Sequence, residues 1–133
     1  MDTSKEYINQ CEKALEIQAL KPCGNPEYWS YGDIFSDGVN VFVCTPAHFP
    51  VSGLIFLPRQ DQLQEMMIPK DEQDCLNKYV VLLDDFQEWV LEKGIGLEWS
   101  YLIQVSMEQL WLAYVMHEKY QKIWANGEWI KEE

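Results

Sequence analysis

The chain has 133 residues, of which 47% are apolar and 14% aromatic, and its formal net charge at pH 7 is −12. This length and composition predict a single domain over residues 1–133 and exclude intrinsic disorder as the default. The negative charge argues against direct binding of DNA or RNA, which depends on Lys and Arg to neutralise phosphates. A basic partner, or solubility alone, accounts for it better.

The cysteines and the N-terminal residues favour a cytoplasmic protein. No CxxC spacing occurs among the four cysteines at positions 11, 23, 44 and 75, which favours buried, reduced thiols over a zinc site or a redox pair. The opening residues MDTSKEY hold no apolar segment typical of a signal peptide. Residues 38–58 lack Asp, Glu, Lys and Arg, but their prolines favour two buried strands joined by a turn over a membrane helix. We expect no cofactor, no metal and no membrane association.

The first half of the chain predicts one helix followed by strands. Thr3 and Glu6 have the spacing of a capping box and open a helix over residues 3–20. Pro22 ends it, because proline disfavours helical backbone in the residue before it. Turn signals and β-favouring residues then predict a small antiparallel meander, with strands near 28–35, 39–44 and 54–57.

The second half predicts three further helices. A short helix is expected over 59–67, and a long helix over 71–93. The long helix has apolar residues at helical spacing, which predicts that this set is buried: Leu76, Tyr79, Val80, Leu83, Phe86 and Val90. Ser106 and Gln109 form a capping box for a last helix over 107–124. Its first half is apolar on every side, which is typical of a helix in the middle of a domain.

Asn126-Gly127 then forms either a helix C-cap or a tight turn before Glu128-Trp129-Ile130. Together these elements predict an α+β fold, in which a small antiparallel sheet of about three strands packs against three to four helices.

The long predicted helix carries a line of carboxylates that we call the acidic ridge, formed by Asp84, Asp85, Glu88 and Glu92. On a helix these side chains lie about 6 Å apart along one face. Trp89 is expected beside them as an aromatic anchor for a partner. A basic groove that normally holds nucleic acid could accept such a ridge. The alternatives are a solvated helix face and a metal site, although no loop here resembles a calcium site.

A second candidate site contains Arg59, the single arginine of the chain, and His48 in a proline-bounded turn. The planar guanidinium suits bidentate pairing with a carboxylate, so Arg59 either pairs with a nearby acid or holds an anionic ligand with His48. A nucleophilic pair of Cys44 and His48 is not indicated, because their spacing does not bring the side chains together. Excess Trp and Tyr in the second half favours core packing, or a partner or homo-oligomer interface.

Three stretches carry a resemblance to known sequences: MDTSKEYINQCEKALEIQ, LPRQDQLQEMM and SMEQLWLAYVMHEKYQKIWANGEWI. They resemble an uncharacterised family of small acidic proteins of bacteriophages and prophages of Firmicutes. The resemblance implies a phage or mobile-element origin and transfers no active site. Small phage accessory proteins often bind and inhibit host machinery, defence nucleases included.

The sequence therefore predicts a non-catalytic accessory protein that acts by protein–protein interaction. In its specific form this is an anti-CRISPR-like, nucleic-acid-mimicking inhibitor of a basic host nucleic-acid-binding protein. The alternatives are a small-anion or nucleotide-binding domain or enzyme that uses Arg59 and His48, and a structural or assembly component of the virion.

Overall fold

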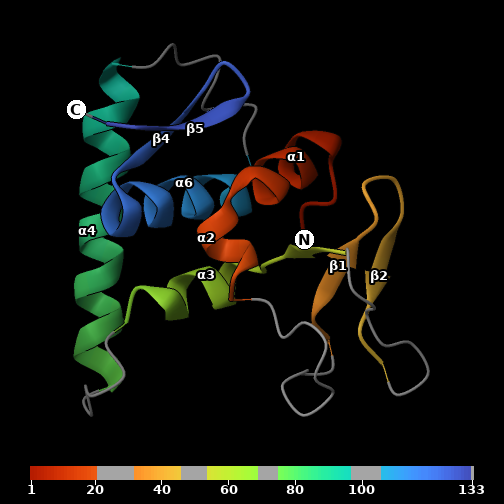
Figure 1. Ribbon diagram of the computed structural model, residues 1–133. Helices are drawn as coiled ribbons and strands as arrows, with labels where there is room; N and C mark the ends of the chain where they lie inside the picture. Colours follow the sequence, from red (N-terminus) through yellow and green to blue (C-terminus); the bar gives the residue numbers. More distant parts are fainter. Residues whose placement is uncertain (21–31, 46–53, 69–74, 97–105, 133) are drawn as a thin grey trace.

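The computed structural model describes residues 1–20, 32–45, 54–68, 75–96 and 106–132, and within 75–96 it describes the side chains of 77–92 (Figure 1). The helices are α1 (Lys5–Lys13), α2 (Leu15–Gln18), α3 (Gln60–Met66), α4 (Cys75–Gly96) and α6 (Met107–Tyr120). The strands are β1 (Ile34–Ser36), β2 (Val41–Val43), β3 (Ile55–Leu57), β4 (Lys122–Ala125) and β5 (Glu128–Lys131). The α+β prediction, with a three-stranded antiparallel sheet, is confirmed.

The predicted first helix forms, but it is capped one residue later and is broken in the middle. The hydroxyl of Ser4, not that of Thr3, accepts a hydrogen bond from the Tyr7 backbone N–H at 3.2 Å. A non-helical backbone at Ala14 (φ −82°, ψ 77°) separates α1 from α2. The break turns α2 toward β3, where it covers that edge of the sheet.

Gln18 closes the outer edge of β3 as a neighbouring strand would. Its side-chain carbonyl accepts from the Phe56 backbone N–H and its amide donates to the Phe56 backbone oxygen, each at 2.9 Å. The same amide donates to the Cys11 backbone oxygen at 2.9 Å. One glutamine thus satisfies both backbone groups of a strand edge, which would otherwise be costly to bury unpaired.

The order of strands differs from the predicted meander. The sheet has the order β2-β1-β3, so β1 and not β2 is central. Phe35 in β1 is 2% exposed, whereas all three residues of β2 are exposed. The prediction that β2 is buried was therefore wrong, while β3 is buried as expected. Apolar composition alone does not distinguish a central strand from an edge strand.

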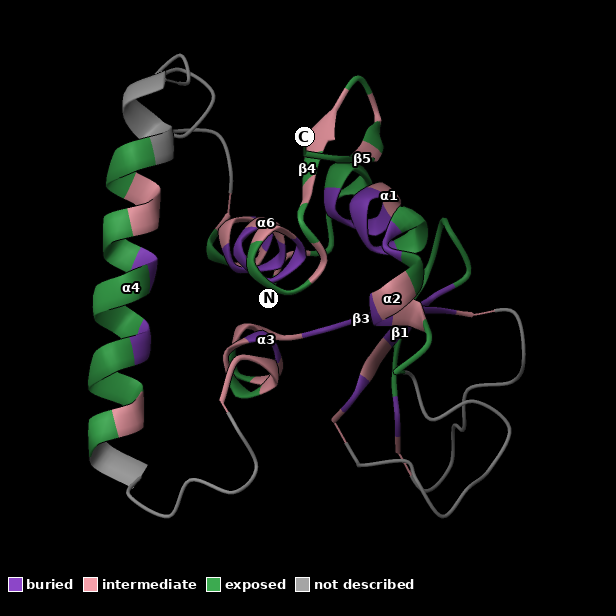
Figure 2. Cartoon of the chain, turned by 60° about the vertical axis from the view of Figure 1, so that its left-hand side comes forward, coloured by how far each residue is buried: buried purple, intermediate pink, exposed green. Residues whose placement is uncertain are grey.

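Helix α6 lies in the middle of the molecule, between α4 and α1 (Figures 1 and 2). Its predicted N-cap is confirmed, because the Ser106 hydroxyl accepts from the Gln109 backbone N–H at 3.0 Å. The helix ends at Tyr120 and not at residue 124, because Gln121 takes a left-handed conformation with φ 55°. Its central position accounts for the complete burial of residues such as Trp111 and Leu112.

Residues 122–131 form a β-hairpin, which replaces the predicted last turn of the helix. Asn126 and Gly127 have φ values of 53° and 79° and connect β4 to β5. Two positive φ angles are typical of the tight turn that matches strand twist, and glycine adopts one without strain. The tight-turn alternative is therefore confirmed, and the C-cap alternative is wrong.

The hairpin is attached to the first helices by polar contacts. The Trp129 indole donates to the Gln10 backbone oxygen at 2.9 Å, and the Lys13 ammonium donates to the Gly127 backbone oxygen at 2.7 Å. Lys122 also forms an ion pair with Glu16. The C-terminal hairpin is therefore fixed to the two N-terminal helices.

The described thiols have the expected character of small buried side chains. Cys11 and Cys44 are free and buried, and burial raises the pKa of each thiol above its ordinary value. Cys23 lies outside the described residues, as does the side chain of Cys75. Within the described part of the chain, no helix combines the length and apolarity that crossing a membrane requires.

Candidate partner-binding surface

Helix α4 is held on the body of the protein by an aromatic cluster that we define as Phe86, Trp89, Trp111 and Tyr114. Phe86 stacks on Trp111 of α6, with ring centroids 3.8 Å apart and planes inclined by 9°. Trp89 and Phe86 each lie 5.4 Å from the ring of Tyr114. This cluster fixes which side of α4 faces α6, and hence which side faces outward.

The buried face of α4 agrees with the prediction only in part: Phe86 is buried and Val90 is half-buried as expected, and the side chain of Leu76 lies outside the described residues. Leu82 and Phe86 are buried at 7% and 8% exposure, whereas Tyr79, Val80 and Leu83 are 42%, 52% and 51% exposed. Apolar residues surround this part of the helix, so helical periodicity fits more than one face. The face that packs is selected by rings of α6, because Trp111 stacks on Phe86 and Tyr114 contacts it edge-on. Figure 2 shows the buried and half-buried positions of α4 turned toward the body, with exposed positions on the outside.

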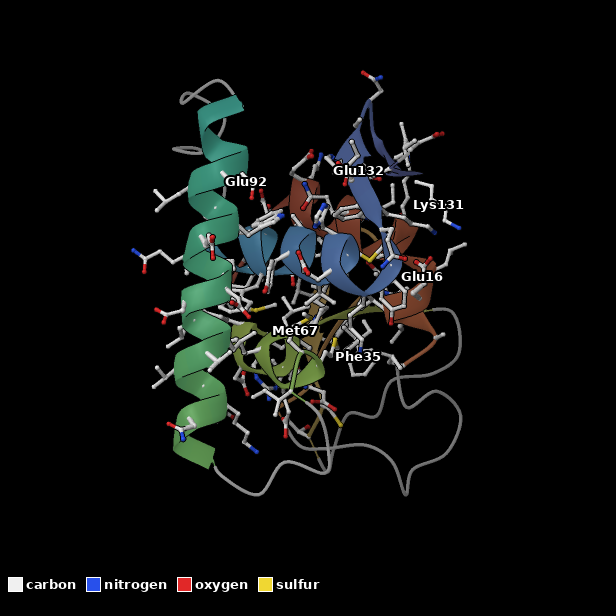
Figure 3. All side chains as sticks on the ribbon, turned by 90° about the vertical axis from the view of Figure 1, so that its left-hand side faces the viewer. Glu16, Phe35, Met67, Glu92, Lys131 and Glu132 are labelled. Atoms are coloured by element: carbon white, nitrogen blue, oxygen red, sulfur yellow. The ribbon has the colours of Figure 1, made fainter. Side chains whose placement is uncertain are left out.

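All four residues of the acidic ridge are exposed. Asp84, Glu88 and Glu92 follow each other at intervals of four residues along α4, and Asp85 lies beside them. Glu92 is labelled in Figure 3, toward the C-terminal end of the helix. Among the residues that the structure describes, no Lys, Arg or His forms an ion pair with any ridge carboxylate.

Several lysines of the chain are engaged elsewhere in the fold. Lys119 donates to the Met66 backbone oxygen at 2.9 Å, Lys13 donates to the Gly127 backbone oxygen in the hairpin turn, and Lys122 pairs with Glu16.

The negative charge of α4 also affects a side chain of α6. Burial, together with the negative charges of Glu118 and Asp85, raises the pKa of the Tyr114 hydroxyl to about 12. The ridge therefore contributes to a negative field that extends from α4 to the adjoining surface of α6.

Trp89 packs against α6 beneath the acidic ridge, and its side chain is not fully exposed beside the carboxylates, as the sequence had predicted it would be. Its side chain is half-buried, and its ring lies 5.4 Å from Tyr114 and 5.9 Å from His117. The indole N–H groups of Trp89 and Trp111 are both buried without an acceptor among the described residues. Trp89 thus positions α4 on α6, and the exposed residues of α4 form the outer surface of the helix.

The structure accounts for Arg59 by contacts within the chain. Its guanidinium donates two hydrogen bonds to the Asp61 carboxylate, at 3.0 and 3.3 Å, and one to the Gly32 backbone oxygen at 2.7 Å. Asp33 lies 3.6 Å away. The hydrogen bond from Arg59 holds the pKa of Asp61 below its usual value, although partial burial acts in the opposite direction. His48, the other residue of the predicted anion site, lies outside the described residues.

One feature of the surface was not predicted from the sequence. It is a set of exposed apolar residues on α4 beside the ridge: Tyr79, Val80, Val81, Leu83 and Leu91. The run of apolar residues at 79–83 was the signal for this feature, since one helix face cannot bury consecutive residues. His117 is half-buried beside Glu118, as its position in the sequence indicated, and its ring nitrogens lie 3.2 Å from Glu118 and 2.7 Å from Glu132.

The described residues contain no group of three or more His, Cys, Asp or Glu side chains arranged to hold a metal ion. Comparison of the chain with protein families, with curated proteins and with solved structures finds no match.

Proposed function

We propose that this chain is a non-catalytic accessory protein, and that it acts by placing the acidic ridge of α4 in the cationic groove of a nucleic-acid-binding protein of a bacterial host. The ridge would occupy sites that normally receive phosphates. That the partner belongs to a bacterial host is inferred from the resemblance of three stretches of the chain to phage and prophage proteins. That the partner is cationic is inferred from the exposed carboxylates of α4.

The observation that carries this proposal is the exposure of Asp84, Asp85, Glu88 and Glu92 on one long helix without ion pairs to described residues. Like charges at helical spacing destabilise a helix, each pair by about 0.2–0.5 kcal/mol. The fold does not relieve this repulsion with the described cationic groups, which supports a role outside the chain. A cationic surface would gain from all four carboxylates at once, and the field would also speed association.

The proposal is tested by capture of proteins from a nuclease-treated bacterial lysate on the immobilised chain. The ridge variant is Asp84→Lys with Glu88→Lys. Its matched control is Glu12→Lys with Glu128→Lys, which reverses two exposed acids on α1 and the hairpin. Each double variant changes the net charge by +4, from −12 to −8. The two proteins therefore differ in where the charge lies and not in how much there is.

We expect the wild-type chain and the control to capture a nucleic-acid-binding protein at low salt, and the ridge variant to lose it. Raising the salt to about 0.5 M should release the partner, because dissolved ions screen the charges and so reduce the range and strength of their attraction. The captured protein should then lose a labelled DNA or RNA probe when the wild-type chain is added. Capture that is equal for the ridge variant and the control would refute the proposal.

A further inference from the structure

We infer that the contact partner of α4 is a basic amphipathic helix, which lies along a line formed by Val80, Asp84, Gln87 and Leu91. This inference rests on the proposed function and specifies the shape and chemistry of the surface that meets the ridge. The four positions follow the spacing i, i+4, i+7 and i+11, which is the spacing of a seam between two packed helices. All four side chains are exposed.

The apolar members of this line are too exposed for residues that serve only the core. Val80 and Leu91 are 52% and 54% exposed, and Leu83, next to the line, is 51% exposed. They lie on α4 away from the aromatic cluster, whose members Phe86 and Trp89 are on the packed side. Single exposed apolar residues are ordinary, but several on one face of one helix mark an interaction surface.

Charge decides between the possible occupants. A second copy of this chain would bring a net charge of −12 against another −12, with Asp84 and Glu88 of each copy near the seam. Like charges placed across an interface oppose association. A partner with Lys or Arg on the flanks of an apolar stripe meets both features, because its apolar side chains cover Val80 and Leu91 while its cations reach the carboxylates.

A cationic groove without apolar side chains would bind only the charged residues of this surface. It would pair the carboxylates but leave Val80, Leu83 and Leu91 in water. An amphipathic helix laid against α4 contacts both sets, and Lys or Arg stems can also cover apolar residues while their charged ends stay in water. The combination of a carboxylate ridge and an apolar line therefore indicates a helical basic partner.

The test uses synthetic helical peptides of about 18 residues as probes, which is about five turns at 3.6 residues per turn. The first peptide has Leu at helical spacing on one face and Lys on both flanks. The second keeps every Lys but replaces each Leu by Gln. Isothermal titration calorimetry measures the affinity of each peptide for the whole chain. The apolar variant is Val80→Gln with Leu91→Gln, and its control is Ile123→Gln with Ile130→Gln on the hairpin, where the two side chains are 41% and 42% exposed.

We expect the Leu/Lys peptide to bind the wild-type chain and the hairpin control alike, and the apolar variant about tenfold or more weakly. The Gln/Lys peptide should bind weakly and equally to the wild-type chain and the apolar variant. An unchanged affinity of the apolar variant for the Leu/Lys peptide would overturn the inference. The proposed function fails separately, if Asp84→Lys with Glu88→Lys leaves the binding of both peptides unchanged. Sedimentation that shows a dimer dissociated by Val80→Gln with Leu91→Gln would assign the surface to a second copy and also overturn the inference.

Discussion

Replacement of Glu88 by Gln should make the protein more stable. Glu88 lies at the centre of the acidic ridge, with Asp84 four residues before it, Asp85 three residues before it and Glu92 four residues after it. Each such like-charge pair costs about 0.2–0.5 kcal/mol, so removing three of them should raise the free energy of unfolding by about 0.6–1.5 kcal/mol. Gln and Glu have nearly equal helix propensity, so the backbone contributes little to this difference.

Urea denaturation at low ionic strength measures this gain, and Glu128→Gln on the exposed hairpin is the control with the same change in net charge. The control should differ from the wild type by less than about 0.5 kcal/mol, as is usual for surface substitutions. In about 1 M salt, where the screening length is about 3 Å, the gain of the Glu88 variant should largely disappear. A Glu88→Gln protein that is less stable than wild type, or a gain that persists in high salt, would refute this reasoning.

The remaining predictions concern what holds the fold together. Phe86→Ala should lower the free energy of unfolding by about 3–5 kcal/mol, because it removes the ring that stacks on Trp111; chemical denaturation followed by tryptophan fluorescence would measure this. Gln18→Ala should cost about 1–3 kcal/mol in the same assay, because it leaves the backbone groups of Phe56 unpaired, and an unchanged midpoint would contradict the role given to this side chain. Burial acts to raise the pKa of Asp2, but the hydrogen bonds it accepts hold the pKa below the ordinary 3.8. Unfolded chains therefore bind more protons near that pH, so stability should fall as pH drops below about 4, and Asp2→Asn should flatten this dependence in pH-resolved denaturation.

Local signals in the sequence predicted much of the fold because they act within a few residues. Ser106 and Gln109 mark the start of α6, as the capping spacing indicated. Asn126-Gly127 marks the hairpin turn, since those two residues tolerate the positive φ angles that the turn requires. The order of the strands could not be predicted in this way, because it depends on which strand is covered by helices far away in the sequence.

The candidate surface was predictable only in part. The exposure of the acidic ridge follows from the cost of burying unpaired carboxylates, so residue type was sufficient. The packed side of α4 was not predictable from periodicity, because apolar residues occur on all sides between Tyr79 and Leu83. That choice is made by two rings of another helix: Trp111 stacks on Phe86, and Tyr114 contacts it edge-on. Because this side of α4 is packed, Trp89 lies in the aromatic cluster, and Val80 and Leu91 are left exposed on the outer side of the helix.

The most direct test of the central claim is the salt dependence of the dissociation constant of the complex between this chain and the nucleic-acid-binding protein that the proposed function expects it to capture. For the wild-type chain, the logarithm of the dissociation constant should rise steeply with the logarithm of the salt concentration. For Asp84→Lys with Glu88→Lys, binding should be much weaker and the slope much shallower, while Glu12→Lys with Glu128→Lys should behave like wild type. Equal slopes for all three proteins would show that the carboxylates of α4 do not meet a cationic surface.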